Sequence, residues 1–111
     1  MSVLLGDGEY KYKVVDNWAK LPENWSFMDV AGVAVNSKDE VFVFNRGLHP
    51  MIIFDIDGNY LRSWGDDLFS RPHGIHIDPD DYIYCTDDGD HTVKKISPDG
   101  KLIFQIGVPG N

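Results

Sequence analysis

The sequence predicts an all-β protein built from two copies of one unit of four short strands. Two observations predict this fold class. The chain aligns with itself, without a gap, when it is shifted by about 42 residues. Within each copy, apolar runs of about four to six residues, rich in Val, Ile, Phe and Tyr, alternate with turn signals. Such runs are too short for helices and are typical of buried strands.

Turn residues carry the repeat. The identical pairs are Gly32/Gly74, Asp39/Asp81, Gly47/Gly89, His49/His91, Asp57/Asp99, Gly58/Gly100 and Gly65/Gly107. Asp-Gly between strands is a strong hairpin signal, because its glycine accepts a positive φ. Four antiparallel strands at a period of about 40–45 residues are typical of a β-propeller blade. We therefore expect one blade over residues 30–70 and a second over residues 71–111.

The second unit also resembles a known family. Residues 86–96, Thr-Asp-Asp-Gly-Asp-His-Thr-Val-Lys-Lys-Ile, resemble the core pattern of the NHL-repeat β-propellers: Asp, then Gly, a small polar residue and His before the third strand. Asp90 and Thr92 depart from the usual Asn and Arg. The resemblance covers residues 30–107, and it implies a propeller that most often has six blades.

Two blades alone would leave two apolar sheet faces uncovered, because an internal blade is buried on both faces. The residues expected on them are Val41, Phe42, Val43, Ile52, Phe54, Ile83, Ile103 and Phe104. Exposed apolar patches of this kind mark interfaces. Three copies would close a six-bladed ring, so we expect a homotrimer. The alternative is a fragment of a longer propeller chain.

Residues 1–29 fit the repeat less well. Glu9–Val15 alternates charged with aromatic or aliphatic residues, as an edge strand does, and would be an extra edge strand or a clasp onto a neighbouring protomer. Residues 16–29 contain Trp18, Trp25 and Phe27 and are expected to form a loop that packs aromatic side chains over one end. Met1–Gly8 lacks the basic region of a secretory signal.

Two further stretches resemble the peptidyl-α-hydroxyglycine α-amidating lyase branch of the family. They are residues 43–49, Val-Phe-Asn-Arg-Gly-Leu-His, and residues 68–78, Leu-Phe-Ser-Arg-Pro-His-Gly-Ile-His-Ile-Asp. The resemblance implies that His73 is one of three zinc ligands and that Arg46 contacts the substrate. In a trimer, three copies of His73 would converge near the axis. Three imidazoles with an open fourth position are the ligand set of a catalytic zinc site.

Each of these residues also has a structural interpretation. His73 can be a polar residue that lines the ring, and Arg46 can form a salt bridge to Asp88 or Asp90. The catalytic tyrosine that the resemblance implies falls on Gly47 and Gly89, although Tyr82 or Tyr84 can stand nearby. Whether the protein is an enzyme is therefore left open.

Other candidate ligands are weaker. The resemblance implies a structural calcium on backbone carbonyls, and Val33 and Ile75 match those positions. The repeated His49 and His91 are expected to bond loop carbonyls. Cys85 lies inside an apolar strand and is expected to be a small buried residue.

Composition narrows the partners. Ten Lys and Arg against eighteen Asp and Glu leave a net charge of −8, which disfavours nucleic acid and anionic membranes. The single cysteine fits a reducing compartment, and we expect a cytoplasmic location. Two functions follow: a lyase-like metalloprotein, or a scaffold that binds a peptide, a protein or a small molecule on the end face of the propeller.

Overall fold

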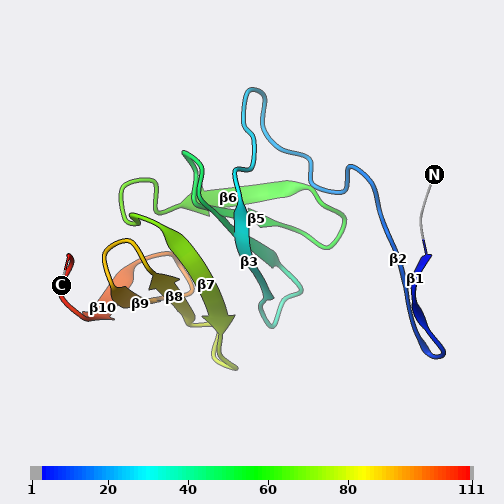
Figure 1. Ribbon diagram of the computed structural model, residues 1–111. Helices are drawn as coiled ribbons and strands as arrows, with labels where there is room; N and C mark the ends of the chain where they lie inside the picture. The colour runs from blue at the N-terminus through cyan, green and yellow to red at the C-terminus, as the bar shows by residue number, and fades with distance from the viewer. Residues whose placement is uncertain (1–3, 111) are drawn as a thin grey trace.

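The computed structural model describes residues 4–110, and every regular element in this range is a β-strand (Figure 1). Blade 1 consists of β3 (Val30–Val35), β4 (Val41–Asn45), β5 (Met51–Phe54) and β6 (Tyr60–Trp64). Blade 2 consists of β7 (Pro72–Ile77), β8 (Ile83–Asp87), β9 (Thr92–Ile96) and β10 (Leu102–Ile106). Each blade is an antiparallel sheet with its strands in chain order, so the all-β fold with two four-stranded units is confirmed. Residues 1–3 and 111, at the ends of the N-terminal segment and the second unit, lie outside the described residues.

The hairpin turns have the predicted chemistry. Gly58 and Gly100 follow aspartates between the third and fourth strands and have φ values of 85° and 87°. Asp39 and Asp81 occupy the matching turns between the first and second strands, with φ values of 58° and 67°. Asp is among the few residues that tolerate this left-handed conformation, and the repeated turns therefore have the same backbone.

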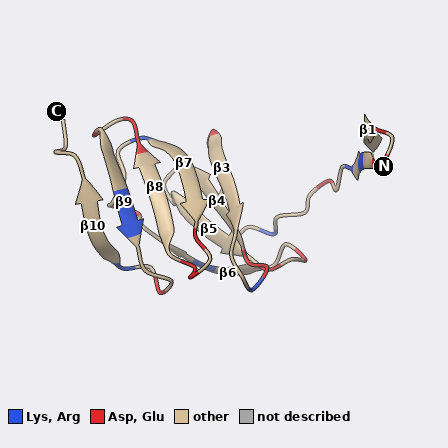
Figure 2. Ribbon diagram, turned by 90° about the horizontal axis from the view of Figure 1, so that it is seen from below, with Lys and Arg blue, Asp and Glu red and all other residues tan. Residues whose placement is uncertain are grey.

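The two blades pack through their innermost strands, β3 and β7, which lie side by side (Figure 2). A Cβ on Gly32 would lie 3.0 Å from Cγ2 of Ile75, so a larger residue would crowd the Ile75 side chain on the neighbouring strand. We call the face of blade 1 that packs on blade 2 its C-side face, and we use the same name for the equivalent face of blade 2. The opposite face of each blade is its N-side face. The core between the blades joins the C-side face of blade 1 to the N-side face of blade 2, and its buried residues are Phe42, Phe44, Met51, Ile53, Ile83, Cys85 and Ile96.

The N-side face of blade 1 is covered by the chain itself. Residues 18–27 lie on Val43, Ile52 and Phe54, and they contribute the side chains of Trp18, Ala19, Leu21, Trp25 and Phe27. The expectation that two blades expose two apolar faces is therefore wrong for most of the residues named. Val43, Ile52 and Phe54 are shielded by this segment, and Phe42 and Ile83 are buried between the blades. Ile103 and Phe104, on β10, remain 51% and 47% exposed.

Residues 18–27 cover the N-side face of blade 1 in the same way that β6 and the following loop cover the N-side face of blade 2. Phe27 packs on Phe54, and Phe69, 42 residues later, packs in the core between the blades. The Trp18 main chain lies against Gly58, whereas the Trp64 indole lies against Gly100 at the matching turn of blade 2. Residues 16–29 were expected as a loop over one end. They do form a loop, and Trp25 lies at one end of the blade, but Trp18, Leu21 and Phe27 pack across the N-side face, in the place of a preceding outer strand.

The N-terminus forms a separate hairpin of β1 (Leu4–Asp7) and β2 (Tyr10–Lys13). The predicted edge strand over Glu9–Val15 is therefore shorter, and it pairs with a neighbour that the sequence did not reveal. Within the described residues this hairpin contacts no other strand, and it projects beyond blade 1 (Figure 1). The projection raises the radius of gyration to 15.0 Å, against about 13 Å for a compact chain of this length. Residues 4–110 include no helix that is long and apolar enough to cross a membrane.

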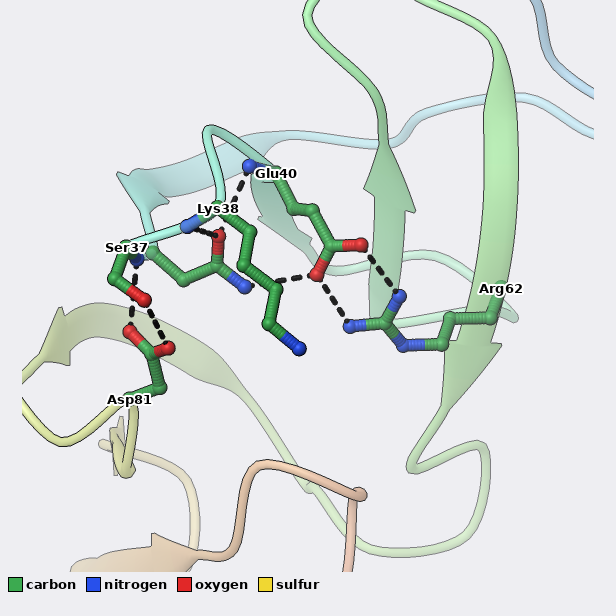
Figure 3. Close-up of polar contacts among 6 residues, drawn as sticks. Ser37, Lys38, Glu40, Arg62 and Asp81 are labelled. Carbon is green, nitrogen blue, oxygen red and sulfur yellow. Dashed lines mark hydrogen bonds and ion pairs between the residues drawn. The ribbon is translucent and has the colours of Figure 1, made fainter.

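A polar clamp holds the blades together at the end that carries the short turns (Figure 3). The Asp81 carboxylate, in a turn of blade 2, accepts hydrogen bonds from the backbone N–H and the hydroxyl of Ser37 in blade 1. Beside it, Arg62 donates two hydrogen bonds to Glu40, at 2.9 and 3.2 Å. The Ser37 hydrogen bonds to Asp81 hold the pKa of that carboxyl below its usual value.

Candidate functional site

The predicted site residues gather at the opposite end of the blades, which we call the loop end. It comprises the connections over residues 23–29, 46–50, 65–71 and 88–91, because antiparallel strands return the chain to this end after every second strand. Residues 23–29 and 65–71 are longer than the five-residue connections at the other end. The loop end also carries most of the chemistry that the sequence analysis singled out.

His73 lies at the start of β7, on a β-bulge. The pairing of β7 with β8 shifts register between Pro72 and Gly74, which leaves His73 as the extra residue. Bulges redirect a side chain and are frequent beside functional sites. The His73 side chain is 61% exposed, and its Nδ1 lies 3.4 Å from Oδ2 of Asp88. An imidazole oriented by a carboxylate at Nδ1 leaves Nε2 for a ligand.

Arg46 reaches across to the strand that carries His73. Its Nε donates a hydrogen bond of 2.8 Å to the carbonyl of Pro72. The salt bridge predicted for Arg46 is not the arrangement found in residues 4–110. Asp88 lies against Arg71 and His73, at 3.6 and 3.4 Å, and Asp90 accepts a hydrogen bond from Lys94. The structure therefore brings Arg46 beside His73 through a backbone contact.

The buried Asp87 carboxylate holds two of the site's loops together. It accepts hydrogen bonds from the backbone N–H groups of Ser70, Arg71, Gly89 and Asp90, at 2.6–3.1 Å. Burial raises the pKa of Asp87, but these backbone donors outweigh it and leave the pKa below its usual value. Sequence reasoning missed this role. The signal was present, because the self-alignment sets Asp87 opposite Asn45, and each ends the second strand of its unit.

A second cluster at the loop end was not predicted. The Trp25 indole stacks on the His49 imidazole, with ring centroids 3.6 Å apart. Nδ1 of His49 lies 3.0 Å from Oδ2 of Asp66. A small cavity of about 140 Å³ opens beside them, and it is lined by Asn24, Trp25, Ser26, Met28, Gly47, Leu48 and His49. The expectation that His49 bonds a loop carbonyl is wrong for its side chain, which meets a carboxylate and an indole.

A side chain at the position implied for a catalytic tyrosine would have to displace its neighbours. A Cβ on Gly47 would lie 2.8 Å from Oδ1 of Asn45, and a Cβ on Gly89 would lie 2.6 Å from Oγ of Ser70. The tyrosines that were expected nearby are elsewhere. The Tyr84 hydroxyl donates to Asp78, at the turn end, and Tyr82 lies under Lys95 on the C-side face of blade 2.

The metal predictions stay predictions. Within residues 4–110, no three His, Cys, Asp or Glu side chains come close enough to hold an ion. A zinc site on His73 requires imidazoles from other chains, so a single chain does not test it. His76 is directed away and lies near Tyr84, with ring centroids 6.0 Å apart. Val33 and Ile75, the predicted calcium positions, lie on the adjacent innermost strands β3 and β7.

Comparison with known proteins identifies relatives of this chain. No family model matches the chain. It is 34% identical to NHL repeat-containing protein 3 of Homo sapiens over 109 residues, which cover 89% of this chain and 31% of that protein. It is 30% identical to peptidylglycine alpha-amidating monooxygenase of Rattus norvegicus over 97 residues, 65% of this chain and 10% of that protein.

A third relative is peptidyl-alpha-hydroxyglycine alpha-amidating lyase 1 of Drosophila melanogaster, 38% identical over 53 residues, 45% of this chain and 10% of that protein. The chain thus spans about a third of the first relative and about a tenth of the others. With its two four-stranded units, the chain is a propeller-type repeat building block. The matches confirm the predicted resemblance to the NHL-repeat propellers, including the amidating-lyase branch.

Proposed function

We propose that the chain completes a six-bladed ring as a homotrimer and that the loop end is its functional face. Two blades are a third of six, and the aligned part is 31% of the human relative. One apolar strand, β10, is exposed along its whole length. In the ring, the C-side face of blade 2 meets the covered N-side face of blade 1 in the next copy, and three such contacts close the circle.

The functional group of the ring is a metal site built from one His73 of each copy. The observation that carries this proposal is the bulge that exposes His73 with Nδ1 turned toward Asp88. Zinc held by three imidazoles has an open fourth position, where it lowers the pKa of a bound water and polarises a carbonyl. Arg46, held against Pro72, supplies a guanidinium for a substrate carboxylate. Calcium on the carbonyls of Val33 and Ile75 is a further proposal.

The second candidate is a scaffold that binds a peptide, a protein or a small molecule at the loop end without chemistry. Gly47 and Gly89 favour it, because a tyrosine at either position would have to displace the side chain of Asn45 or Ser70. The cavity beside Trp25 and His49 favours it as well. In both candidates we propose a cytoplasmic protein, whose lone Cys85 stays reduced.

The test is the solution mass by light scattering, with zinc and calcium measured on the same peak. We expect about 38 kDa, three times the 12.6 kDa chain, and one zinc per trimer. His73→Ala should remove the zinc, and His91→Ala, at another exposed loop histidine, should retain it. A trimer without metal leaves the scaffold, and a folded monomer overturns the ring. Aggregation of the chain would indicate that it is part of a longer propeller.

A further inference from the structure

The C-side face of blade 2 does not match the face that it repeats. In blade 1 this face is Phe42, Phe44, Met51 and Ile53, which are at most 1% exposed. Their counterparts, 42 residues later, are Tyr84, Thr86, Val93 and Lys95, and each is only half-buried. Two apolar positions have therefore become a hydroxyl and an ammonium group. A neighbour of this face must offer an acceptor for Lys95 as well as apolar surface.

Lys95 packs among three aromatic rings on this face. Its Nζ lies 4.7 Å from the ring centroid of Tyr82, 5.5 Å from that of Tyr84 and 5.7 Å from that of Phe104. Within residues 4–110 it forms no ion pair, although the chain carries eighteen acidic residues. The face therefore presents an aromatic surface with one cation that forms no close ion pair, although its charge is one of the influences that lower the pKa of Asp78.

The N-terminal hairpin has the complementary composition. Its register pairs Leu5 with Tyr12 and Asp7 with Tyr10. Directly opposed residues share a face and alternate residues return to it, so these four side chains lie on one face of the hairpin. That face has two tyrosines, a leucine and a carboxylate. A two-stranded hairpin is marginally stable by itself, and this one contacts no other strand of the described chain.

The hairpin and the open face lie at opposite extremes of the molecule. Figure 1 shows β1 and β2 beyond the free side of blade 1, and β10 on the far side of blade 2. The hairpin therefore cannot cover the blade 2 face of its own chain. In the proposed ring, the next copy turns the free side of its blade 1, with its hairpin, toward this face.

We propose that the β1–β2 hairpin of a second copy clasps part of the C-side face of blade 2, with Asp7 paired to Lys95 and the hairpin tyrosines packed on Tyr84 and Phe104, while blade 1 of that copy covers the rest of the face. This proposal rests on the proposed ring, because the ring brings the second copy to this face. It explains why the terminal face is amphipathic and why the hairpin is unpartnered within one chain.

Charge reversal tests the clasp on the full-length chain. Asp7→Lys and Lys95→Asp should each raise the dissociation constant of the assembly at least about tenfold, because like charges then face each other. The double variant should restore association toward the wild-type value. Lys13→Asp, on the other face of the hairpin, is the matched control and should change the dissociation constant less than about threefold.

The readouts are sedimentation equilibrium for the assembly and hydrogen exchange for the hairpin amides. All three substituted positions are at the surface or half-buried, and circular dichroism of each of the four variants establishes that the blades remain folded. A wild-type trimer that neither reversal weakens would overturn the clasp and leave the ring standing. A wild-type chain that stays monomeric, with fast exchange in the hairpin, would overturn both.

Discussion

Blades 1 and 2 have the same strands and turns, but different side chains form the hydrogen bonds to the backbone groups of their loops. In blade 1, Asn45 accepts two backbone N–H groups and donates to the carbonyls of His49 and Pro50. In blade 2, the same position is Asp87, and its carboxylate accepts four backbone N–H groups. The backbone conformation is the same in the two blades, but the side chain that holds the loops differs: an amide in blade 1 and a carboxylate in blade 2.

The cores differ in the same way. The N-side face of blade 1 has Ile52 where blade 2 has Lys94. Lys94 is 3% exposed and is satisfied by Asp90 at 2.9 Å and by the Thr92 hydroxyl at 2.6 Å, with its ammonium 5.7 Å from the Phe69 ring centroid. A buried cation is tolerated because partners surround it. Blade 1 is thus held mainly by apolar burial, and blade 2 relies more on placed charges.

The largest expected effect contrasts the two C-side faces. Phe44→Ala removes a ring that is fully buried against Phe69 and should lower the free energy of unfolding by about 3–5 kcal/mol. Thr86→Ala, at the equivalent half-buried position of blade 2, should cost less than about 1 kcal/mol. Urea unfolding at one protein concentration measures both. Equal losses would mean that the blade 2 face is as deeply buried as that of blade 1.

The next largest effect is expected at Asn45 and Asp87, the side chains that hydrogen-bond the loop backbone. Asp87→Asn should lower the free energy of unfolding at pH 7 by roughly 1–3 kcal/mol, because an amide –NH₂ would face backbone donors. Asn45→Asp should cost a similar amount, since a carboxylate would then face the carbonyls of His49 and Pro50. Urea unfolding of both variants and the wild type gives the two losses. A neutral result for Asp87→Asn would show that the four N–H contacts do not need a carboxylate.

The same variant has a pH signature. Burial opposes the ionisation of Asp87, but the N–H donors of Arg71 and Ser70 lead the groups that hold its pKa below the usual value. Its contribution is therefore fully present above about pH 4 and is lost as the pH falls through the folded-state pKa. The stability difference between wild type and Asp87→Asn should shrink below about pH 4. A constant difference down to pH 2 would contradict the depressed pKa.

Much of this fold follows from the sequence alone. The self-alignment predicted eight strands and their turns, since Gly58 and Gly100 need a positive φ that few residues tolerate. It did not reveal the role of residues 16–29, because their likeness to β6 and its loop is one of position more than of residue type. Phe27 and Phe69 match, whereas Trp18 has no tryptophan 42 residues later. That segment is the reason the predicted exposed face of blade 1 is buried.

The site was predictable only in part. The motifs singled out Arg46 and His73, and the structure brings them to the same end of β7. Their contacts were beyond the sequence, because a bulge and a side-chain rotamer decide them. The Trp25–His49 stack was likewise hidden, since it joins the covering segment to a blade loop. Periodicity predicts strands, and it carries no information on which loops meet.

A smaller effect is expected at the turn end. In blade 1, Arg62 is paired with Glu40 and lies 5.9 Å from the Phe42 ring centroid. The equivalent pair in blade 2 is Tyr82 and Phe104, with no charge between them. Arg62→Ala should lower the free energy of unfolding by about 0.5–1 kcal/mol, because the pair is half-exposed.

This loss of stability should also depend on pH. The hydrogen bond from Arg62 is the main cause that holds the pKa of Glu40 below its usual value, so the loss should fade below about pH 4. Urea titrations at pH 7 and pH 3 measure it, and an equal cost at both would assign the loss to packing.

The smallest effect is expected at Cys85, whose counterpart in blade 1 is Val43. Cys85→Val should change the free energy of unfolding at pH 7 by no more than roughly 0.5 kcal/mol, because the equivalent position in the other blade already holds a valine.

Burial raises the pKa of the Cys85 thiol to about 12, so the native protein should not react with a thiol reagent at pH 8. Because the unfolded thiol ionises near pH 8.5, the wild type should lose stability as the pH rises above that value, and Cys85→Val should not share the loss. Rapid labelling of the folded wild type at pH 8 would show that the core between the blades opens more readily than its burial implies.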